Sequence, residues 1–519
     1  FHRAFAAAAP ASEAPIEHAA AIVRLVDGLP LAIELAAAQG ATLPAAAIRT
    51  LLETSGLVAL ARGRRDDPAR FATMDAAIAW SADLLPAAAR RLLLVLGAFR
   101  GGFTPGAIAG VASELGEPAL FGGLPLLAEA HLVMADPDPA VAAEGRLRML
   151  EPVRMFARER LLAAAGDPAA VRAHAAWFHR WARQQAEIVA GPEPLAGLDA
   201  LEADLANVRA AIAASCDPAT GDPADALATA AALSQFWEIR GRFAEGRAAL
   251  ADALAAATAG ADAPPTVPLM EALFYAGYLA YMQSDLPVVE QAGTRLRPLA
   301  AAAGLPEDAG RVAILDVFAG DLDGREPAAL LGPIQAAHAA LAGFDQGTSW
   351  QQSLVIAANL LLECGDAEAA LPLHHAYGDW ATRRGEAIHA RAADAWLGFD
   401  LLLLDRPAEA RGHFVATLAG SHGTRAIIFI AWSILGVAIA ESRLGEGDRA
   451  VRAALAARLH GAFDADLDRH RLGLTTLQGR LRDDSRALLA EALGADRFAA
   501  LLAEGRELSP DDVLRLARA

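Results

Sequence analysis

The sequence predicts an all-α protein whose longer, C-terminal part is an array of paired helices. Apolar residues make up 55% of its 519 residues, and alanine, the strongest helix former, dominates them. Aromatic residues make up only 6%, and the β-branched residues that favour strands are sparse. From residue 170 onward, tight polar turns separate helical patterns and return about every 40 residues.

The first predicted segment, residues 1–62, is helical. Its stretch 16–26 reads IEHAAAIVRLV and predicts a helix with Ile16, Ala20 and Val23 on one apolar face. This periodicity places the first helix at the start of the segment.

A sharp corner follows in the run VDGLPLAIELAAAQG. Gly28 is suited to the left-handed position that ends a helix. Pro30 is suited to the first turn of the next helix, where its missing N–H costs nothing. The local pattern therefore predicts a helix–turn–helix corner, which is a purely structural interpretation of these residues.

Residues 63–166 predict a winged-helix domain, entered through the charged, irregular stretch ARGRRDDPAR. Two helical patterns come first. In GGFTPGAIAGVA, Thr104 is a plausible N-cap and Pro105 the first helical residue of the next helix. A third helix is expected in EPALFGGLPLLAEA, weakened by its glycines and proline. The short apolar runs HLVMADP and GRLRML then predict a small β-hairpin, and EPVRMFARERLLAAAG a closing helix.

Residues 167–519 predict an α-solenoid of helix hairpins. Each repeat has a first helix, a tight polar turn and a second helix that begins with small residues. Because one hairpin cannot bury its apolar face alone, stacked neighbours supply the core. The expected second helices lie in GRFAEGRAALADAL, SDLPVVEQAGTRL, CGDAEAALPLHHA, DRPAEARGHFVAT and GEGDRAVRAALAA.

Charge and composition limit the function. The net charge is −18, which disfavours nucleic acid and anionic membrane as partners. All 45 basic residues are arginine, which excludes any chemistry that needs a lysine amine. The two cysteines, Cys216 and Cys364, lie far apart in the sequence, and no signal peptide or membrane-spanning apolar run is evident. We therefore expect a cytoplasmic protein in a reducing compartment.

Taken together, the motifs resemble the STAND class of signalling ATPases, the NB-ARC-like group, and in particular bacterial LuxR-type ATP-binding transcriptional regulators. The segment VDGLPLAIELAA is similar to the GLPL motif of that class. TMDAAIAWSADLLPAAARRLLLVLGAFRGGFT and RMLEPVRMFARERL resemble the winged-helix region that follows it. LEADLANVRAAIAAS, FWEIRGRFAEGRAALADAL and LLAEGRELSPDDVLRLA resemble the two ends of the tetratricopeptide-like sensor region.

The resemblance implies a nucleotide-dependent switch. Residues 1–62 would be the terminal helical part of the ATPase module, and Gly28, Leu29 and Pro30 would form one wall of a pocket for ATP or ADP. No GxxxxGK[ST] run is present, so the phosphates would be held by a P-loop domain expected upstream of these residues. We accordingly expect no catalysis by this chain alone, and no tight nucleotide binding by it.

Two features depart from that pattern. Leu150 and Glu151 stand where the family's winged helix carries the His and Asp of its phosphate-contacting motif, and leucine cannot bond a phosphate. The expected reading helix, GEPALFGGLPLLAEAH, contains no arginine, so we expect no DNA binding by this winged helix. Arg146 and Arg148 precede Leu150, and they are expected to be solvated or paired charges.

The solenoid is the expected partner-binding part. Seven aromatic residues fall on first helices of repeats, and they either pack between repeats or line a groove for a peptide or small ligand: Trp237, Tyr275, Tyr278, Tyr281, Trp350, Trp396 and Trp432. His374, His375 and His389 lack the spacing of a metal site.

Two functional hypotheses remain. In the first, the chain is the regulatory portion of a STAND-type regulator, the solenoid binds a protein or small-molecule inducer, and the GLPL and winged-helix region closes on a nucleotide. In the second, the chain is a nucleotide-independent, tetratricopeptide-like binding scaffold with a vestigial winged helix.

Overall fold

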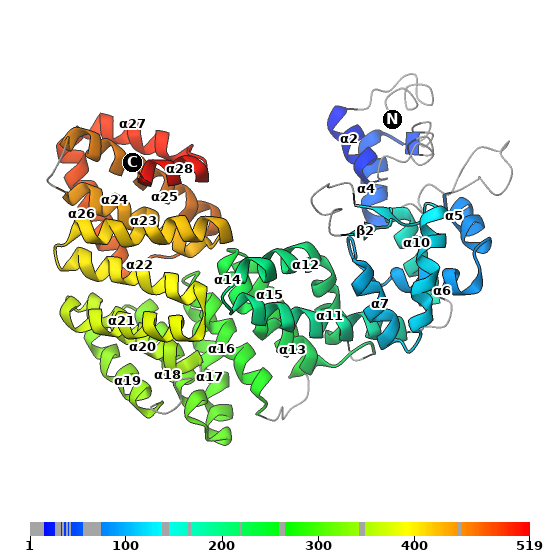
Figure 1. The fold of residues 1–519 in the computed structure, drawn as a ribbon, viewed down its shortest axis with the longest axis horizontal. Coiled ribbons are helices and arrows are strands. Elements are labelled where there is room, and N and C mark those ends of the chain that lie inside the picture. Colours follow the sequence, from blue (N-terminus) through cyan, green and yellow to red (C-terminus); the bar gives the residue numbers. More distant parts are fainter. Residues whose placement is uncertain are drawn as a thin grey trace. The chain divides into compact units, whose positions relative to one another are not determined.

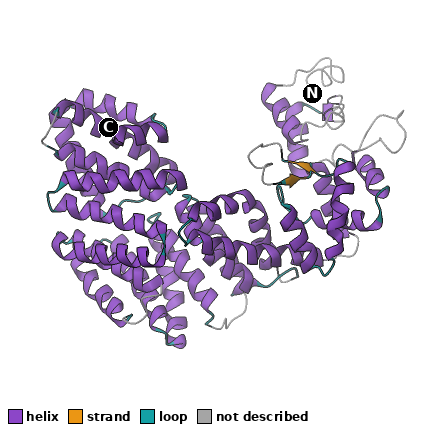
Figure 2. Ribbon diagram, viewed as in Figure 1, coloured by secondary structure: helices purple, strands orange, loops and turns teal. Residues whose placement is uncertain are grey.

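The computed structural model is helical almost throughout, with one pair of short strands (Figures 1 and 2). It describes residues 15–25, 33, 36–37, 40, 43–55, 74–136, 145–163, 168–217, 219–258, 265–341, 348–444 and 448–518. The chain forms two compact units: unit 1 comprises Phe1–His179 and Asp204–Gly221, and unit 2 comprises Arg180–Ala203 and Asp222–Ala519. The all-α fold class predicted from composition is confirmed.

Unit 1 contains the helices and the strand pair that the sequence predicted for residues 63–166, preceded by helices of the first segment. Its described elements are α2 (Ile16–Leu25), α4 (Ala45–Ser55), α5 (Met74–Asp83), α6 (Ala87–Leu96), α7 (Pro105–Glu114), the 3-10 helix η4 (Pro118–Gly123), α8 (Leu124–Glu129), β1 (Met134–Ala135), β2 (Leu147–Arg148) and α10 (Glu151–Ala163). Two longer helices, α11 (Pro168–Val189) and α12 (Pro194–Cys216), contribute residues to both units.

The predicted hairpin is present as an antiparallel pair, with Met134 opposite Arg148. Phe103 extends it: its backbone exchanges two 2.8 Å hydrogen bonds with Leu147. Thr104 caps α7 as expected, because its hydroxyl accepts a 3.1 Å hydrogen bond from the N–H of Ala107. The change from helical to alternating apolar spacing was therefore a sound guide to this part of unit 1.

Two details of unit 1 differ from prediction. In α2 the buried residues are Ala19 and Ile22, whereas Ile16 is 78% exposed, so the predicted apolar face was wrong. In an alanine-rich helix, small side chains fit almost any face, and the periodicity is weak. The expected third helix divides into η4 and α8, since a Cβ on Gly123 would lie 2.9 Å from the Cα of Ala89.

A buried ion pair joins the hairpin to α12 within unit 1. The guanidinium of Arg146 donates to both carboxylate oxygens of Asp204 at 2.9 Å, and Arg146 is 5% exposed. Asn207 extends the network by donating to Gly102 O at 2.9 Å and accepting from the N–H of Arg100 at 2.6 Å. Arg146 is thus a paired charge, as expected, and it fixes β2 against α12.

Unit 2 is the predicted solenoid, in which consecutive helices pack as antiparallel neighbours (Figure 1). Its helices are α13 (Pro223–Ala232), α14 (Ser234–Ile239), α15 (Phe243–Ala257), α16 (Val267–Tyr281), α17 (Leu286–Ala303), α18 (Pro306–Leu322), α19 (Pro327–Ala340), α20 (Thr348–Glu363), α21 (Ala367–Arg384), α22 (Ala387–Leu403), α23 (Pro407–Thr424), α24 (Ile427–Arg443), α25 (Arg449–His470), α26 (Thr476–Leu493), α27 (Ala495–Arg506) and α28 (Pro510–Arg518).

All five predicted second helices are present, as α15, α17, α21, α23 and α25. One repeat was missed, since α19 was not among the predicted second helices. Its start nevertheless falls midway between the starts of α17 and α21, as a period of about 40 residues requires.

The repeats of unit 2 pack closely because aromatic rings rest on glycines. Phe414 of α23 is fully buried between Gly398 of α22 and Gly436 of α24. A Cβ on Gly436 would lie 2.4 Å from three ring atoms of Phe414, and one on Gly398 would lie 2.6 Å from the ring. The absence of side chains at these two positions lets three successive helices share one ring.

We expect Asp204→Ala to destabilise unit 1 by about 3–5 kcal/mol, because it leaves the Arg146 guanidinium buried and uncompensated. Urea unfolding, with hydrogen exchange to assign the transition to unit 1, measures the change. The control is Asp316→Ala, which removes an exposed 2.6 Å pair with Arg297 and should cost about 1 kcal/mol or less. Equal losses in the two variants would contradict the central role given to the buried pair.

We expect Gly436→Ala to lower the stability of unit 2 by about 1–3 kcal/mol, because the new methyl group overlaps the ring of Phe414. The matched control is Gly412→Ala on α23, where a Cβ meets nothing within 4 Å. That control should gain about 0.5–1 kcal/mol from helix propensity. Adding Phe414→Leu to Gly436→Ala should recover part of the loss, and a stabilising Gly436→Ala would refute the packing argument.

Candidate functional site

The candidate site is a cavity of about 680 Å³ inside unit 2. First helices of successive repeats line it. Of the seven aromatic residues that the sequence placed either between repeats or in a groove, five belong to its wall: Tyr275, Tyr278, Tyr281, Trp396 and Trp432. The other two pack elsewhere. Trp237 is 1% exposed and rests on Gly246, and Trp350 lies beside His338 with ring centroids 5.3 Å apart.

Contacts between its early and late repeats close unit 2 around the cavity. The guanidinium of Arg240, which follows α14, donates to the carbonyl oxygen of Thr424 at 3.0 Å, 184 residues later. Gln235 and His389 meet at 3.3 Å, and the N–H of Gly473 donates to Met282 O at 3.3 Å. The helices therefore surround a partly open cavity, where the sequence analysis considered a groove.

The aromatic part of the wall offers flat ring faces. Tyr281 and Phe318 are stacked, with centroids 4.0 Å apart and planes 10° from parallel. Trp396 and Trp432 lie 4.8 Å apart at 53°. Such faces bury apolar surface and also attract cations through their quadrupoles.

Two carboxylates are hydrogen-bonded to tyrosines of this wall, and each tyrosine lies one repeat away from its carboxylate in the sequence. The hydroxyl of Tyr278 donates to Glu238 Oε1 at 2.8 Å, and the hydroxyl of Tyr281 donates to Asp321 Oδ2 at 2.8 Å. Each pair joins residues 40 positions apart, one helix hairpin to the next. These bonds tie adjacent repeats together at the cavity wall.

Burial perturbs the titration of this wall. Desolvation raises the pKa of Glu238 to about 7, although the hydrogen bond from Tyr278 works in the opposite direction. Desolvation and the nearby Glu238 carboxylate hold the pKa of the Tyr278 hydroxyl well above its usual range. Ionising Glu238 or Tyr278 in this wall therefore costs free energy, and such perturbed groups are common at functional sites.

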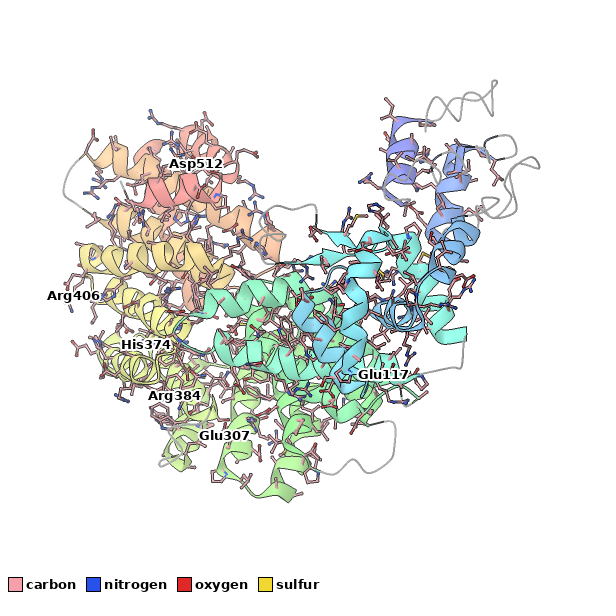
Figure 3. All side chains as sticks on the ribbon, turned by 45° about the vertical axis from the view of Figure 1, so that its right-hand side comes forward. Glu117, Glu307, His374, Arg384, Arg406 and Asp512 are labelled. Atoms are coloured by element: carbon pink, nitrogen blue, oxygen red, sulfur yellow. The ribbon has the colours of Figure 1, made fainter. Side chains whose placement is uncertain are left out.

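The two guanidinium groups at the wall are already paired. Arg384, at the end of α21 (Figure 3), lies 2.6 Å from Glu386 and stacks 5.4 Å from the ring of Trp380. Arg183 lies 3.3 Å from Asp225. By contrast, within the part of the chain that the structure describes, neither Asp321 nor Glu363 forms an ion pair.

The histidines considered for metal have structural partners. His374, on α21 (Figure 3), is fully buried and bonds Asp400 through Nδ1 at 2.9 Å and Asn359 through Nε2 at 3.2 Å. His389 bonds the hydroxyl of Tyr377 at 2.7 Å and lines the cavity. Among described residues, no group of three or more His, Cys, Asp or Glu is placed to hold a metal ion.

The predicted nucleotide-wall residues Gly28, Leu29 and Pro30 lie outside the described residues. Leu150 and Glu151 are half-buried where β2 leads into α10, and the Glu151 carboxylate pairs with Arg154 on the same helix. Sequence reasoning found the aromatic side of the cavity but missed its acids. The signal that could have located them was the spacing of 40 positions between Glu238 and Tyr278 and between Tyr281 and Asp321, which places each acid one repeat from a tyrosine.

No helix in the described ranges combines the length and apolar character needed to cross a membrane. Comparison with family models gave no match. The chain is 33% identical over 229 residues to two proteins provisionally named HTH-type transcriptional regulators, Rv0890c of Mycobacterium tuberculosis and Mb0914c of Mycobacterium bovis. The match covers 43% of this chain and 25% of each relative, so the chain spans about a quarter of the length of the curated proteins it matches.

Among solved structures, the chain is similar to a Signal Transduction ATPase with Numerous Domains (STAND) protein with a tetratricopeptide repeat sensor, PH0952 from Pyrococcus horikoshii. The sequences are 12% identical, and the TM-score is 0.36 over 91% of this chain and 75% of that one. The names of the two curated relatives agree with the transcriptional regulators that the sequence motifs resemble.

Proposed function

We propose that this chain is the effector-sensing, regulatory portion of a transcriptional regulator, and that the cavity of unit 2 is where the effector binds. The cavity is the observation that carries the proposal. Its 680 Å³ falls in the usual range for small-molecule sites, and its wall combines aromatic faces with a few polar groups. The names of the relatives that match over 229 residues support the regulatory role.

In the intact cytoplasmic protein, the effector would bias a nucleotide-dependent switch. The GLPL residues Gly28, Leu29 and Pro30 would contribute one wall of a pocket for ATP or ADP, and a P-loop domain would hold the phosphates. Support for this part comes from the motif resemblance alone. The chain described here would then sense, and nucleotide hydrolysis would reside in the ATPase core.

A nucleotide-independent binding scaffold is the second candidate. The arrangement at Leu150 and Glu151 favours it, since Leu150 offers no hydrogen bond and the Glu151 carboxylate is engaged by Arg154. The two candidates share the cavity of unit 2 and differ in whether nucleotide controls the response.

Blocking the cavity tests the sensing role. Ala228 lines the cavity, and Ala228→Trp should place an indole ring in it that obstructs part of the binding space. In cells carrying the edited gene, RNA sequencing should show the same set of altered transcripts for Ala228→Trp as for deletion of the gene. Ala232→Phe, at a second lining position, should reproduce the effect.

The matched control for cavity blocking is Ala336→Trp, at an exposed position on α19 outside the cavity, which should leave transcript levels at wild type. Circular dichroism of the purified variants confirms that each is folded. Wild-type transcripts in cells with folded Ala228→Trp and Ala232→Phe would contradict the proposal.

A buried carboxylate that serves binding should lower the stability of the folded protein when it is ionised. For Glu238, this effect can be measured as a dependence of stability on pH. Between its ordinary pKa of 4.5 and about 7, folded Glu238 holds a proton that the unfolded chain releases. The free energy of unfolding therefore falls as pH rises through that window, by up to about 1.4 kcal/mol per pH unit.

We expect Glu238→Gln to remove this fall, so that unit 2 of the variant is more stable than wild type at pH 8 and similar to it at pH 4.5. Urea unfolding across pH 4.5–8 measures the difference, with the exposed Glu290→Gln on α17 as the control substitution. A Glu238→Gln protein that is less stable than wild type at pH 8 would show that the carboxylate is structural.

A further inference from the structure

We propose that the cavity of unit 2 binds a small organic cation, an ammonium group carried on an aromatic or apolar body. This inference rests on the proposed sensing function and names the chemical class of its effector. The charges, ring faces and unsatisfied polar groups of the wall each contribute one step to it.

Two carboxylates of the wall repel each other and form no ion pair among the described residues, although the charge of Arg480 partly offsets the repulsion at Glu363. Asp321, at the end of α18, and Glu363, at the end of α20, come from adjacent repeats and both line the cavity. Asp321 accepts from Tyr281, and Glu363 accepts from the N–H of Leu477 at 2.8 Å. Burial and, to a smaller degree, the charge of Asp321 raise the pKa of Glu363. A bound cation would relieve this repulsion.

The neighbouring rings suit a cation as well as an apolar body. The stacked pair Tyr281 and Phe318 adjoins Asp321, since the Tyr281 hydroxyl is bonded to that carboxylate. An ammonium group held over a ring face gains roughly 0.5–2 kcal/mol, more when water is excluded. Aromatic faces beside carboxylates form the combination that recognises an organic ammonium group.

Two amide groups of the wall lack partners. Gln478 is 1% exposed; its Oε1 accepts from the N–H of Thr475 at 3.3 Å, but its Nε2 has no hydrogen-bond partner among described residues. Gln352 Oε1 is likewise buried and unpartnered among them. Both atoms are covered by the surrounding protein, so a ligand contacts them only after a rotamer change of these side chains; because an unmade buried hydrogen bond costs free energy, a polar ligand that accepts from Gln478 and donates to Gln352 favours that change.

The same wall disfavours an anion. Its two arginines, Arg183 and Arg384, are engaged by Asp225 and Glu386, so no unpaired guanidinium of the wall is available to a carboxylate or phosphate ligand. The net charge of −18 also raises the local concentration of cations around the chain. An organic cation fits this cavity better than a metal ion because most of the wall is apolar or aromatic.

Three probes of one shape and different charge test the inference on the full chain: tyramine, 4-hydroxyphenylacetamide and 4-hydroxyphenylacetate. Saturation-transfer NMR and calorimetry should show tyramine binding at least tenfold more tightly than the neutral amide, and the acetate most weakly. Asp321→Asn and Glu363→Gln should each weaken tyramine binding about tenfold, which corresponds to about 1.4 kcal/mol. Both substitutions keep an oxygen acceptor for the existing hydrogen bonds.

Glu290→Gln, exposed on α17, should bind tyramine as wild type does, and Ala228→Trp should abolish binding. Equal or tighter binding of the amide or the acetate, or no binding of tyramine at millimolar concentration, would overturn the cation assignment. Neither result bears on the sensing function, which the transcript changes in cells with a blocked cavity test separately.

Discussion

Close approach of helices through small residues is the constraint on which unit 2 depends. Alanine and glycine line the helix contacts, and large rings such as Phe414 occupy the space that missing side chains leave at Gly398 and Gly436. Interiors packed in this way tolerate little change in volume. The tight stacking sets the rotation from one repeat to the next, and that rotation brings α14 back to α24, where Arg240 reaches Thr424.

The cavity exists because early and late helices of unit 2 meet while the side chains between them leave space unfilled. First helices face inward, and they carry tyrosine, tryptophan and carboxylate side chains where a dry core would need aliphatic ones. Buried carboxylates without cations oppose folding, and proteins retain such groups at sites where they serve binding. The hydrogen bonds of Tyr278 to Glu238 and of Tyr281 to Asp321 hold the polar wall in a defined geometry.

Local signals in the sequence predicted the local parts of this structure. Thr104 starts α7 as expected, because capping depends on residues only a few positions apart. The 40-residue period located the second helices except α19. In α2, alanine gave too little contrast between faces to place Ile16 correctly.

The site could be predicted only in part, because its walls come from residues far apart in the sequence. Tyr275, Tyr278 and Tyr281 were identifiable as inward-facing because they recur on one first helix. Closure of the solenoid depends on the sum of many small rotations, and no short motif encodes the contact between Arg240 and Thr424. The pairing of Glu238 with Tyr278 follows from the repeat period, but its burial follows from the closure.

A closed circuit of repeats has a mechanical consequence that an open spiral lacks. An open solenoid can stretch or coil with little cost. In unit 2, a change in circumference must break the hydrogen bond between Arg240 and Thr424 or strain the packing between successive repeats. The cross-repeat bonds of Glu238 and Asp321 sit on the inner rim of that ring. Glu238 lies only two residues from Arg240, so a ligand that engages this carboxylate would also act on the contact between Arg240 and Thr424.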